Sequence, residues 1–155
     1  MGIKSFLAAR KAKKKSTGDI PVLVRDYMST KLITFKSGEE IEKVIDSLIK
    51  NRISGAPVVN NKNELIGVIS EGDCIKYISD SRYYNMPLEK STVEKHMVKN
   101  VETIEGSMNI FDAANKFLES KRRRFPIVEN GKLIGQISQK DILKAALALK
   151  GHSWK

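Results

Sequence analysis

The residues best suited to ligand chemistry are two serine–aspartate pairs with one shared spacing. Ser70 stands three residues before Asp73, and Ser138 three residues before Asp141; each serine ends an apolar, β-branched run. The pattern predicts a strand that ends at the serine and a helix that begins there. The free N–H groups of such a helix can bind phosphate, and a carboxylate one turn later can accept the two hydroxyls of a ribose. The pairs equally fit a capping box, in which they only stabilise the helix start.

Other chemical motifs are missing from the sequence. It has no P-loop, no G-x-G-x-x-G and no H-E-x-x-H, and its one cysteine, Cys74, excludes an intramolecular disulfide and a thiolate metal site. Neither histidine, His96 or His152, has the spacing of a metal ligand or a catalytic triad. We therefore expect Cys74 to fill the core and His96 to be an ordinary surface or partly buried residue. An enzyme is the least favoured class of function, and no catalytic residue or metal ligand is assigned.

Both pairs lie in a segment that occurs twice in the chain. Val24–Met28 (VRDYM) returns 69 positions later as Val93–Met97 (VEKHM). Leu65–Asp73 (LIGVISEGD) returns 68 positions later as Leu133–Asp141 (LIGQISQKD), with six of nine residues identical. An internal duplication explains this match better than chance does.

The apolar spacing in each copy predicts the order strand, helix, strand, strand, helix. Apolar residues at i, i+3, i+4, i+7 and i+8 predict the first helix of each copy. They are Ile41, Val44, Ile45, Leu48 and Ile49 in one copy and Ile110, Ala113, Ala114, Phe117 and Leu118 in the other. Ser37 is the predicted N-cap of that helix, paired with Glu40. Asn130-Gly131 is a strong hairpin signal between the last two strands. The other predicted ranges are strands 33–35, 56–59 and 65–69 with helix 71–78, then strands 101–104, 125–128 and 133–137 with helix 139–150, which stops at Gly151.

These elements predict an α/β (α+β) fold of tandem β-α-β-β-α repeats. The expected organisation is a basic arm over 1–20, a first repeat over 21–80, a linker over 81–92, a second repeat over 93–150 and a tail over 151–155. A repeat of about 60 residues buries a sheet face poorly when alone. We therefore expect the two repeats to pack through their sheets as one module.

The net charge of +10, from 28 basic and 18 acidic residues, is concentrated in the arm. Residues 1–15 contain six cations and no acid, and Ile3, Phe6 and Leu7 give them an amphipathic spacing. A solubilising or partner-docking tail, a nucleic-acid contact and a contact with an anionic membrane surface all fit this pattern. No apolar run reaches the roughly 18 residues of a transmembrane segment, and no signal peptide pattern begins the sequence. A cytoplasmic location is the expectation.

The duplicated order V-x-x-x-M, threonine-containing strand, amphipathic helix, x-x-P-V-V and G-x-h-S-x-x-D resembles a pair of cystathionine-β-synthase (CBS) domains, the Bateman module. The resemblance covers residues 22 to about 147. It implies a non-catalytic regulatory module that binds adenosine-containing ligands (AMP, ADP, ATP and in some members S-adenosylmethionine) in two clefts between the halves. It also implies a homodimer and a partner protein, unidentified by the sequence, that reads ligand occupancy.

The resemblance further implies a role for individual residues. Asp73 and Asp141 would hold ribose hydroxyls, and Ser70 and Ser138 would meet phosphate. The adenine pocket would be lined by Thr34 and Thr103 and, largely through the backbone, by Ser54, Gly55, Ala56 and Pro57 in the first copy and Arg124, Phe125 and Pro126 in the second. Arg52 and Lys121, each five residues before the proline, would face phosphate, with Arg122 beside Lys121 in the run 121–124. The small residues 54–56 make the first-copy site the roomier of the two.

Two classes of function therefore stay open at this stage. The favoured one is a sensor of adenine nucleotides, in which a ligand biases the packing of the two halves. The other is a nucleic-acid-associated accessory protein, in which the basic arm makes salt-dependent contacts with phosphates.

Overall fold

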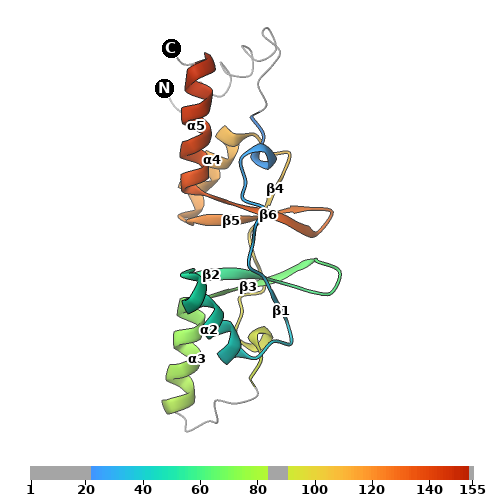
Figure 1. Ribbon diagram of the computed structural model, residues 1–155, viewed down its shortest axis with the longest axis vertical. Helices are drawn as coiled ribbons and strands as arrows, with labels where there is room; N and C mark the ends of the chain where they lie inside the picture. Colours follow the sequence, from blue (N-terminus) through green and yellow to red (C-terminus); the bar gives the residue numbers. More distant parts are fainter. Residues whose placement is uncertain (1–21, 84–90, 154–155) are drawn as a thin grey trace. The chain divides into compact units, whose positions relative to one another are not determined.

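The computed structural model describes residues 22–83 and 91–153 of the chain, and its two copies have the same element order (Figure 1). The first copy contains η1 (Val24–Asp26), β1 (Phe35–Lys36), α2 (Ile41–Asn51), β2 (Gly55–Val59), β3 (Leu65–Ser70) and α3 (Glu71–Tyr83). The second contains η2 (Val93–Lys95), β4 (Ile104–Glu105), α4 (Ile110–Ser120), β5 (Arg124–Glu129), β6 (Lys132–Ser138) and α5 (Gln139–Ser153). The predicted strand, helix, strand, strand, helix order is confirmed in both copies, and the fold is mixed α+β.

Each copy forms a three-stranded sheet with the order first, second, third strand. In the first copy β1 is parallel to β2, with Phe35 opposite Val58, and β2 is antiparallel to β3, with Gly55 opposite Ser70. In the second copy β4 is parallel to β5, with Ile104 opposite Ile127. Helices α2 and α3 cover one face of the first sheet, and α4 and α5 cover one face of the second (Figure 1).

The turn between β5 and β6 has the geometry that its sequence predicts. Asn130 has φ 53° and Gly131 has φ 79°. Two consecutive residues with positive φ are typical of the tight turn whose twist suits a hairpin. The hairpin predicted from Asn130-Gly131 is therefore confirmed.

The core of each unit is built on the predicted helical stripe, except at its last position. Ile41, Val44 and Leu48 are buried in the first copy and Ile110, Ala113 and Phe117 in the second. In contrast, Ile49 is 71% exposed and Leu118 is 67% exposed. At about 100° per residue, position i+8 lies about 80° away from position i, whereas i+7 returns to the same side. The stripe therefore ends one residue earlier than predicted.

Three predicted helix limits are wrong. Helix α2 begins at Ile41 with Glu40 as its N-cap and has no side-chain cap, so Ser37 does not cap it. Helix α3 continues to Tyr83, into the range predicted as linker, and α5 passes Gly151 to end at Ser153. An ion pair between Lys76 and Asp80, 3.0 Å apart, stabilises the later turns of α3.

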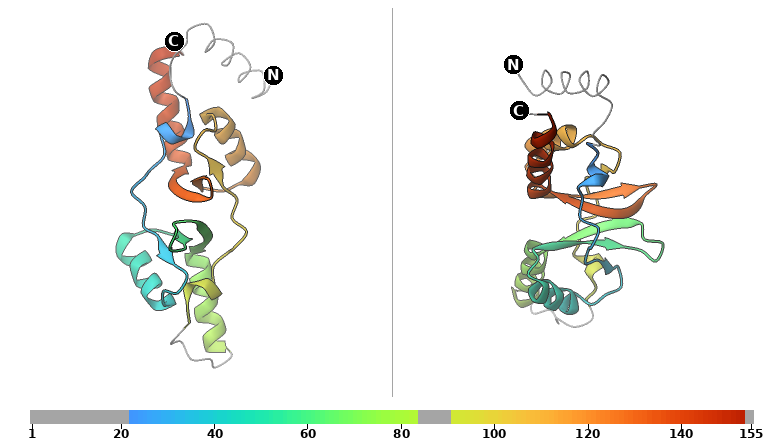
Figure 2. Two further views of the ribbon diagram at one scale, coloured as in Figure 1. Left: turned by 90° about the vertical axis from the view of Figure 1, so that its right-hand side faces the viewer. Right: turned by 45° about the horizontal axis from the view of Figure 1, so that its top comes forward.

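The two compact units of the chain exchange their leading segments relative to the two sequence copies (Figure 2). The first-copy unit contains residues 31–83, 91–102 and 130–133, and the second-copy unit contains residues 22–30, 103–129 and 134–153. In the second-copy unit, the Ile110 N–H donates to the Val22 carbonyl at 2.7 Å and the Val24 N–H donates to the Met108 carbonyl at 2.8 Å. In the first-copy unit, the Val93 N–H donates to the Glu39 carbonyl at 2.9 Å. The leading segment of each copy thus completes the unit of the other.

A glycine in each sheet receives the methionine of the exchanged segment. A Cβ atom on Gly135 would lie 2.6 Å from the Met28 sulfur and 2.8 Å from the Ser29 carbonyl oxygen. A Cβ atom on Gly67 would lie 2.6 Å from the Met97 sulfur and 2.9 Å from the Val98 carbonyl oxygen. These distances leave no room for a side chain at either glycine. The methionine of each V-x-x-x-M motif therefore packs on the glycine in the third strand of the other copy.

Candidate functional site

The sheet topology brings most of the predicted site residues of each copy to one edge. Because β2 and β3 are antiparallel, with Gly55 opposite Ser70, the start of β2 lies at the same edge as the end of β3, while β1 runs parallel to β2 with Phe35 opposite Val58. Thr34 precedes β1, Gly55 starts β2 and Ser70 ends β3. Arg52 enters this edge from the end of α2, and Asp73 lies in the first turn of α3. We call this group, with Ser54, Ala56 and Pro57, the first-copy site.

The second copy repeats the arrangement. Thr103 precedes β4, Arg124 starts β5 and Ser138 ends β6. Lys121 lies just after the end of α4, and Asp141 lies in the first turn of α5. We call this group, with Arg122, Phe125 and Pro126, the second-copy site. Each predicted set is therefore contained within one compact unit.

The serine–aspartate pairs form reciprocal hydrogen bonds at the starts of α3 and α5. The Ser70 N–H and hydroxyl both donate to Asp73 Oδ2 at 2.9 Å, and the Asp73 N–H donates to Ser70 Oγ at 3.2 Å. The Ser138 N–H donates to Asp141 Oδ2 at 2.9 Å, and the Asp141 N–H donates to Ser138 Oγ at 3.2 Å. This geometry is a capping box. It uses Oδ2 of each aspartate and leaves Oδ1 for a further donor.

The two basic residues before the proline adopt the left-handed backbone conformation. Arg52 has φ 54° and ψ 45°, and Lys121 has φ 56° and ψ 32°, each as the residue that follows a helix. Glycine is preferred at such a position because a Cβ atom is strained there, by about 1 kcal/mol. A basic side chain at both positions therefore replaces the residue that local stability favours.

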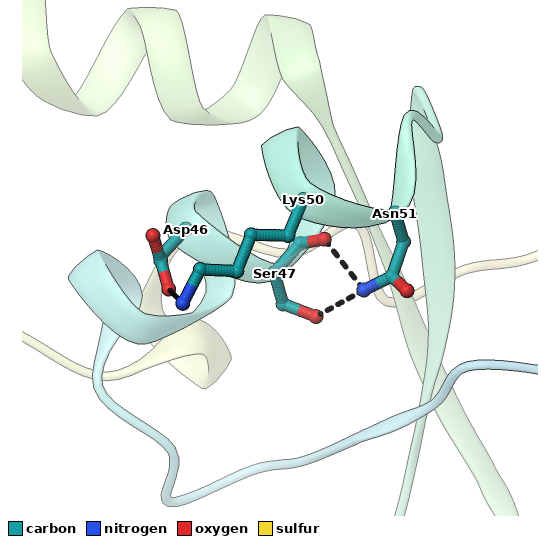
Figure 3. A network of polar contacts seen from close by, with 4 residues as sticks. All are labelled: Asp46, Ser47, Lys50 and Asn51. Atoms are coloured by element: carbon teal, nitrogen blue, oxygen red, sulfur yellow. Dashed lines mark hydrogen bonds and ion pairs between the residues drawn. The ribbon is translucent and has the colours of Figure 1, made fainter.

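Polar contacts in the last turns of α2 hold the helix end that carries Arg52 (Figure 3). Lys50 pairs with Asp46 at 2.8 Å, and the Asn51 side-chain amide donates to the Ser47 carbonyl at 2.8 Å and to Ser47 Oγ at 3.2 Å. The hydrogen bond and the charge of Asp46 raise the pKa of Lys50. These contacts lie on the exposed side of the helix and stabilise its last turn.

Two equivalent site positions, 56 and 125, hold side chains of different size that are both buried. Ala56 and Phe125 are buried in the cores, and the Phe125 ring packs edge-on against Phe117 with centroids 4.8 Å apart. Their side chains therefore serve packing. Gly55 is tightly packed as well, because a Cβ atom there would lie 2.8 Å from the Ile69 carbonyl oxygen.

The predicted sets omitted Arg123 and Gln139 in the second copy and Glu71 in the first, and hydrogen bonds place all three at the helix starts of the sites. The Gln139 N–H, at the start of α5, donates to the Arg123 carbonyl at 3.2 Å. In the first copy, the Glu71 N–H at the start of α3 donates to the Ser54 carbonyl at 2.8 Å. Arg123 could have been found from the repeat offset, because it corresponds to Ser54. Glu71 and Gln139 lie between the serine and the aspartate of each pair, but the motif leaves that position unspecified.

Cys74 and His96 have structural roles. Cys74 is buried in the first core, where burial and the charges of Asp73 and Glu71 raise the pKa of its thiol. His96 is partly buried, its Nε2 lies 2.6 Å from Ser91 Oγ, and its ring packs edge-on against Tyr77 with centroids 4.6 Å apart. Burial and Lys95 lower the pKa of His96, against the opposing charges of Asp73 and Asp80. Both sequence-based expectations, a core cysteine and a partly buried histidine, are confirmed.

Across residues 22–83 and 91–153, no cluster of three or more histidine, cysteine or acidic side chains could hold a metal ion. Within the same ranges, no helix has both the length and the apolar content to cross a membrane.

Two β-α-β-β-α repeats, each with a serine–aspartate pair at the strand-to-helix junction, define a class of paired α+β domains. The chain belongs to the CBS-domain family, whose family model matches residues 24–80 and 93–148. The resemblance inferred from the sequence is therefore confirmed, and the chain is a CBS domain pair.

Solved structures and curated proteins agree with this family. The chain is 28% identical to the CBS-pair protein CBSX2 in complex with AMP, with a TM-score of 0.73 over 84% of this chain and 99% of that one; CBSX2 is from Arabidopsis thaliana. It is 26% identical to the CBS domain pair of protein MJ0100 in complex with 5′-methylthioadenosine and S-adenosyl-L-methionine, with a TM-score of 0.66 over 83% of this chain and 98% of that one. It is 28% identical over 99% of its length to protein MJ1225 of Methanocaldococcus jannaschii, of which it spans about half (51%).

Proposed function

We propose that this CBS domain pair is a non-catalytic regulatory module that binds adenosine-containing ligands at the first-copy and second-copy sites. Asp73 and Asp141 accept ribose hydroxyls, while Ser70 and Ser138, with the helix N-termini beside them, meet phosphate. Thr34 and Thr103 and the main chain of residues 54–57 and 124–126 line the adenine pocket.

One observation carries the proposal. In both copies the capping box uses Oδ2 of the aspartate, so Oδ1 is available to a ligand at a helix N-terminus. The pattern alone would be satisfied by helix capping. It gains weight because relatives at 26% and 28% identity have been solved with adenosine compounds bound.

The proposed regulation is a shift in population between conformations. A ligand that binds one arrangement of the chain more tightly than another favours that arrangement by its difference in affinity. A partner protein would read this change. Arg52 and Lys121 would face the phosphate of the ligand, and both sites carry this basic residue in a left-handed backbone conformation.

A calorimetric panel tests the proposal. We expect the full chain to bind at least one of AMP, ADP, ATP, 5′-methylthioadenosine and S-adenosylmethionine, with a thermal midpoint that rises with ligand concentration by mass action. Guanosine and cytidine monophosphates are the controls, and they should bind more weakly because the adenine pocket is specific. A chain that binds none of the five adenosine compounds would refute the proposal.

A homodimer is the second element of the proposal, and exposed apolar side chains support it. On the helices of the described residues, six large apolar side chains are exposed, namely Ile49, Ile75 and Ile78 in the first-copy unit and Leu118, Leu143 and Leu147 in the second-copy unit. Large apolar side chains exposed on helices of both units are candidates for burial in an association site. A second copy of this chain, with the same helices, is the proposed occupant.

Polyanion binding by the arm is the alternative function, and its charge is the observation that favours it. Residues 1–15 carry six cations. Deleting residues 2–15 should weaken salt-dependent binding of RNA or DNA and leave adenosine-ligand affinity unchanged, because the site residues lie outside the arm. Loss of adenosine-ligand binding on this deletion would contradict that division of roles.

A further inference from the structure

The two sites differ strongly in charge although their backbones correspond. At the first-copy site the equivalent positions hold one cation, Arg52, against two carboxylates, Glu71 and Asp73, which gives −1. At the second-copy site five cations, Lys140 and those of the run 121–124, stand against Asp141, which gives +4. Five charge units therefore separate two copies of one site.

A corresponding main-chain hydrogen bond joins this segment to the helix start in both copies. The Gln139 N–H donates to the Arg123 carbonyl at 3.2 Å, and the Gln139 side-chain amide donates to the Arg122 carbonyl at 3.2 Å. In the first copy the Glu71 N–H donates to the Ser54 carbonyl at 2.8 Å. The main chain of Arg122 and Arg123 is thus held at the start of α5, next to Ser138, whereas the corresponding position at the start of α3 is the uncharged Ser54.

The helix N-termini add to the difference. The first turn of α3 contains two acids, Glu71 and Asp73, while the first turn of α5 contains only Asp141. Carboxylates in the first turn offset the positive end of the helix dipole, and that end is what favours an anionic ligand. The raised pKa of Cys74, to which the charges of Asp73 and Glu71 contribute, is consistent with a negative field at the start of α3.

We propose that the two sites select different adenosine ligands by charge. The second-copy site takes a nucleotide with a polyphosphate chain, and the first-copy site takes an adenosine compound whose 5′ group is uncharged or cationic, such as a thioether or a sulfonium. This inference rests on the proposed function and assigns a ligand class to each site. Opposite charges favour binding and like charges oppose it. Each added phosphate should therefore strengthen ligand binding at the second-copy site, which carries +4, and not at the first-copy site, which carries −1.

Variants that each keep one intact site allow the two affinities to be measured separately. Asp73→Ala disrupts the first-copy site and keeps the second-copy site, and Asp141→Ala does the reverse. By calorimetry, the Asp73→Ala protein should bind ATP at least about tenfold more tightly than 5′-methylthioadenosine, because hydrogen bonds to charged groups are each worth about a factor of ten or more. The Asp141→Ala protein should bind 5′-methylthioadenosine or S-adenosylmethionine at least as tightly as ATP.

Charge variants then identify the cause. In the Asp73→Ala background, Arg123→Gln with Lys140→Gln should weaken the affinity for ATP about tenfold and leave the affinity for 5′-methylthioadenosine unchanged. In the Asp141→Ala background, Glu71→Gln should strengthen the affinity for ATP about two- to fivefold, because it removes an exposed charge of the same sign as the phosphates. Lys62→Gln is the control, since Lys62 is an exposed turn residue and its loss should change neither affinity.

A salt titration tests the role of charge without a further substitution in the Asp73→Ala protein. ATP affinity of the Asp73→Ala protein should fall steeply between about 0.05 and 0.5 M salt, over which the Debye length shortens several-fold, while 5′-methylthioadenosine affinity should not. Equal ATP preference at both sites, or no response to the charge variants and salt, would overturn this inference and leave the proposed function intact. A wild-type chain that binds no adenosine compound would overturn both.

Discussion

At the scale of single residues, Gly135 tests how the exchanged segment is seated. Gly135→Ala should destabilise the protein by about 1–3 kcal/mol, the usual cost of overpacking, because the Ser29 carbonyl oxygen would lie 2.8 Å from the new Cβ atom and belongs to the main chain. Urea unfolding measures this change. Gly38→Ala is the matched control, since nothing lies within 4 Å of a Cβ atom there. Equal stability of the two variants would contradict the seating of Met28 and Ser29 on Gly135.

His96 predicts a loss of stability in acid. Its pKa is lowered from 6.5 in the folded protein, mainly by burial, so the unfolded chain binds more protons as the pH falls below that value. The stability that neutral His96 contributes is complete above about pH 6.5 and is lost as the pH falls from there through the lowered pKa. The charged groups around the ring are Lys95, Lys76, Asp73 and Asp80, and its ring and hydroxyl neighbours are Tyr77 and Ser91.

Thermal unfolding at several pH values measures this effect. His96→Gln should reduce the fall of the thermal midpoint between about pH 7.5 and pH 5.5, because glutamine does not titrate. His152→Gln is the control, since it removes the other histidine of the chain. A wild-type pH profile that His96→Gln leaves unchanged would exclude His96 as its source.

At the scale of elements, the segment 22–30 is predicted to stabilise the second-copy unit rather than its own copy. Val22 packs in a cluster with Phe111 and Leu149, and its carbonyl accepts from Ile110. Deleting residues 1–30 should therefore lower the hydrogen-exchange protection of β5 and β6 and spare that of β2 and β3. Deleting residues 1–20 is the control. If the deletion of residues 1–30 lowered protection mainly in β2 and β3, that result would contradict the assignment of segment 22–30 to the second-copy unit.

The elements themselves could be predicted from the sequence because each has a strong local signal. The apolar stripes of α2 and α4 and the Asn130-Gly131 turn are patterns that only one local structure satisfies. Helix starts are less certain, because capping depends on contacts outside the helix. Ser37 has a capping-box sequence, but its carbonyl accepts from the Glu94 N–H at 3.3 Å, whereas Asn109, which has no such pattern, caps α4 through the Phe111 N–H at 2.7 Å.

The exchange of leading segments could not be predicted from the duplication. Met28 and Met97 stand in the same motif, and so do Gly67 and Gly135, so local complementarity is the same for pairing within a copy and between copies. Only tertiary structure separates the two pairings. The duplication also indicated the candidate site, because Ser70 and Asp73 recur as Ser138 and Asp141. The sequence could not separate helix capping from ribose binding at these residues, because a capping box and a ribose acceptor share one pattern.

At the scale of the whole molecule, the exposed helix faces predict a homodimer. Leu143 and Leu147 lie one turn apart on α5 and are 66% and 72% exposed. Leu143→Glu with Leu147→Glu should convert the dimer to a monomer, because two charges would be buried without partners. Light scattering at micromolar concentration measures the mass. Lys144→Glu, on an exposed residue of the same helix, is the control that changes charge without removing apolar surface. A monomeric wild-type chain, with and without ligand, would contradict the dimer.

The central claim is that Asp73 and Asp141 bind a ribose in addition to capping their helices, and one calorimetric experiment tests it. Replacing either by alanine removes a cap and should cost about 0.5–2 kcal/mol of stability. Asn109→Ala, which also removes a side-chain cap, should cost the same and is the matched control. At the mutated site, loss of the charged acceptor should weaken an adenosine ligand at least about tenfold.

The measurement is the titration of an adenosine ligand into the folded double variant, Asp73→Ala with Asp141→Ala, beside the wild type and Asn109→Ala. We predict that the wild type and Asn109→Ala bind with the same affinity and that the double variant loses binding. A folded double variant that binds adenosine ligands as the wild type does would show that both aspartates only cap their helices.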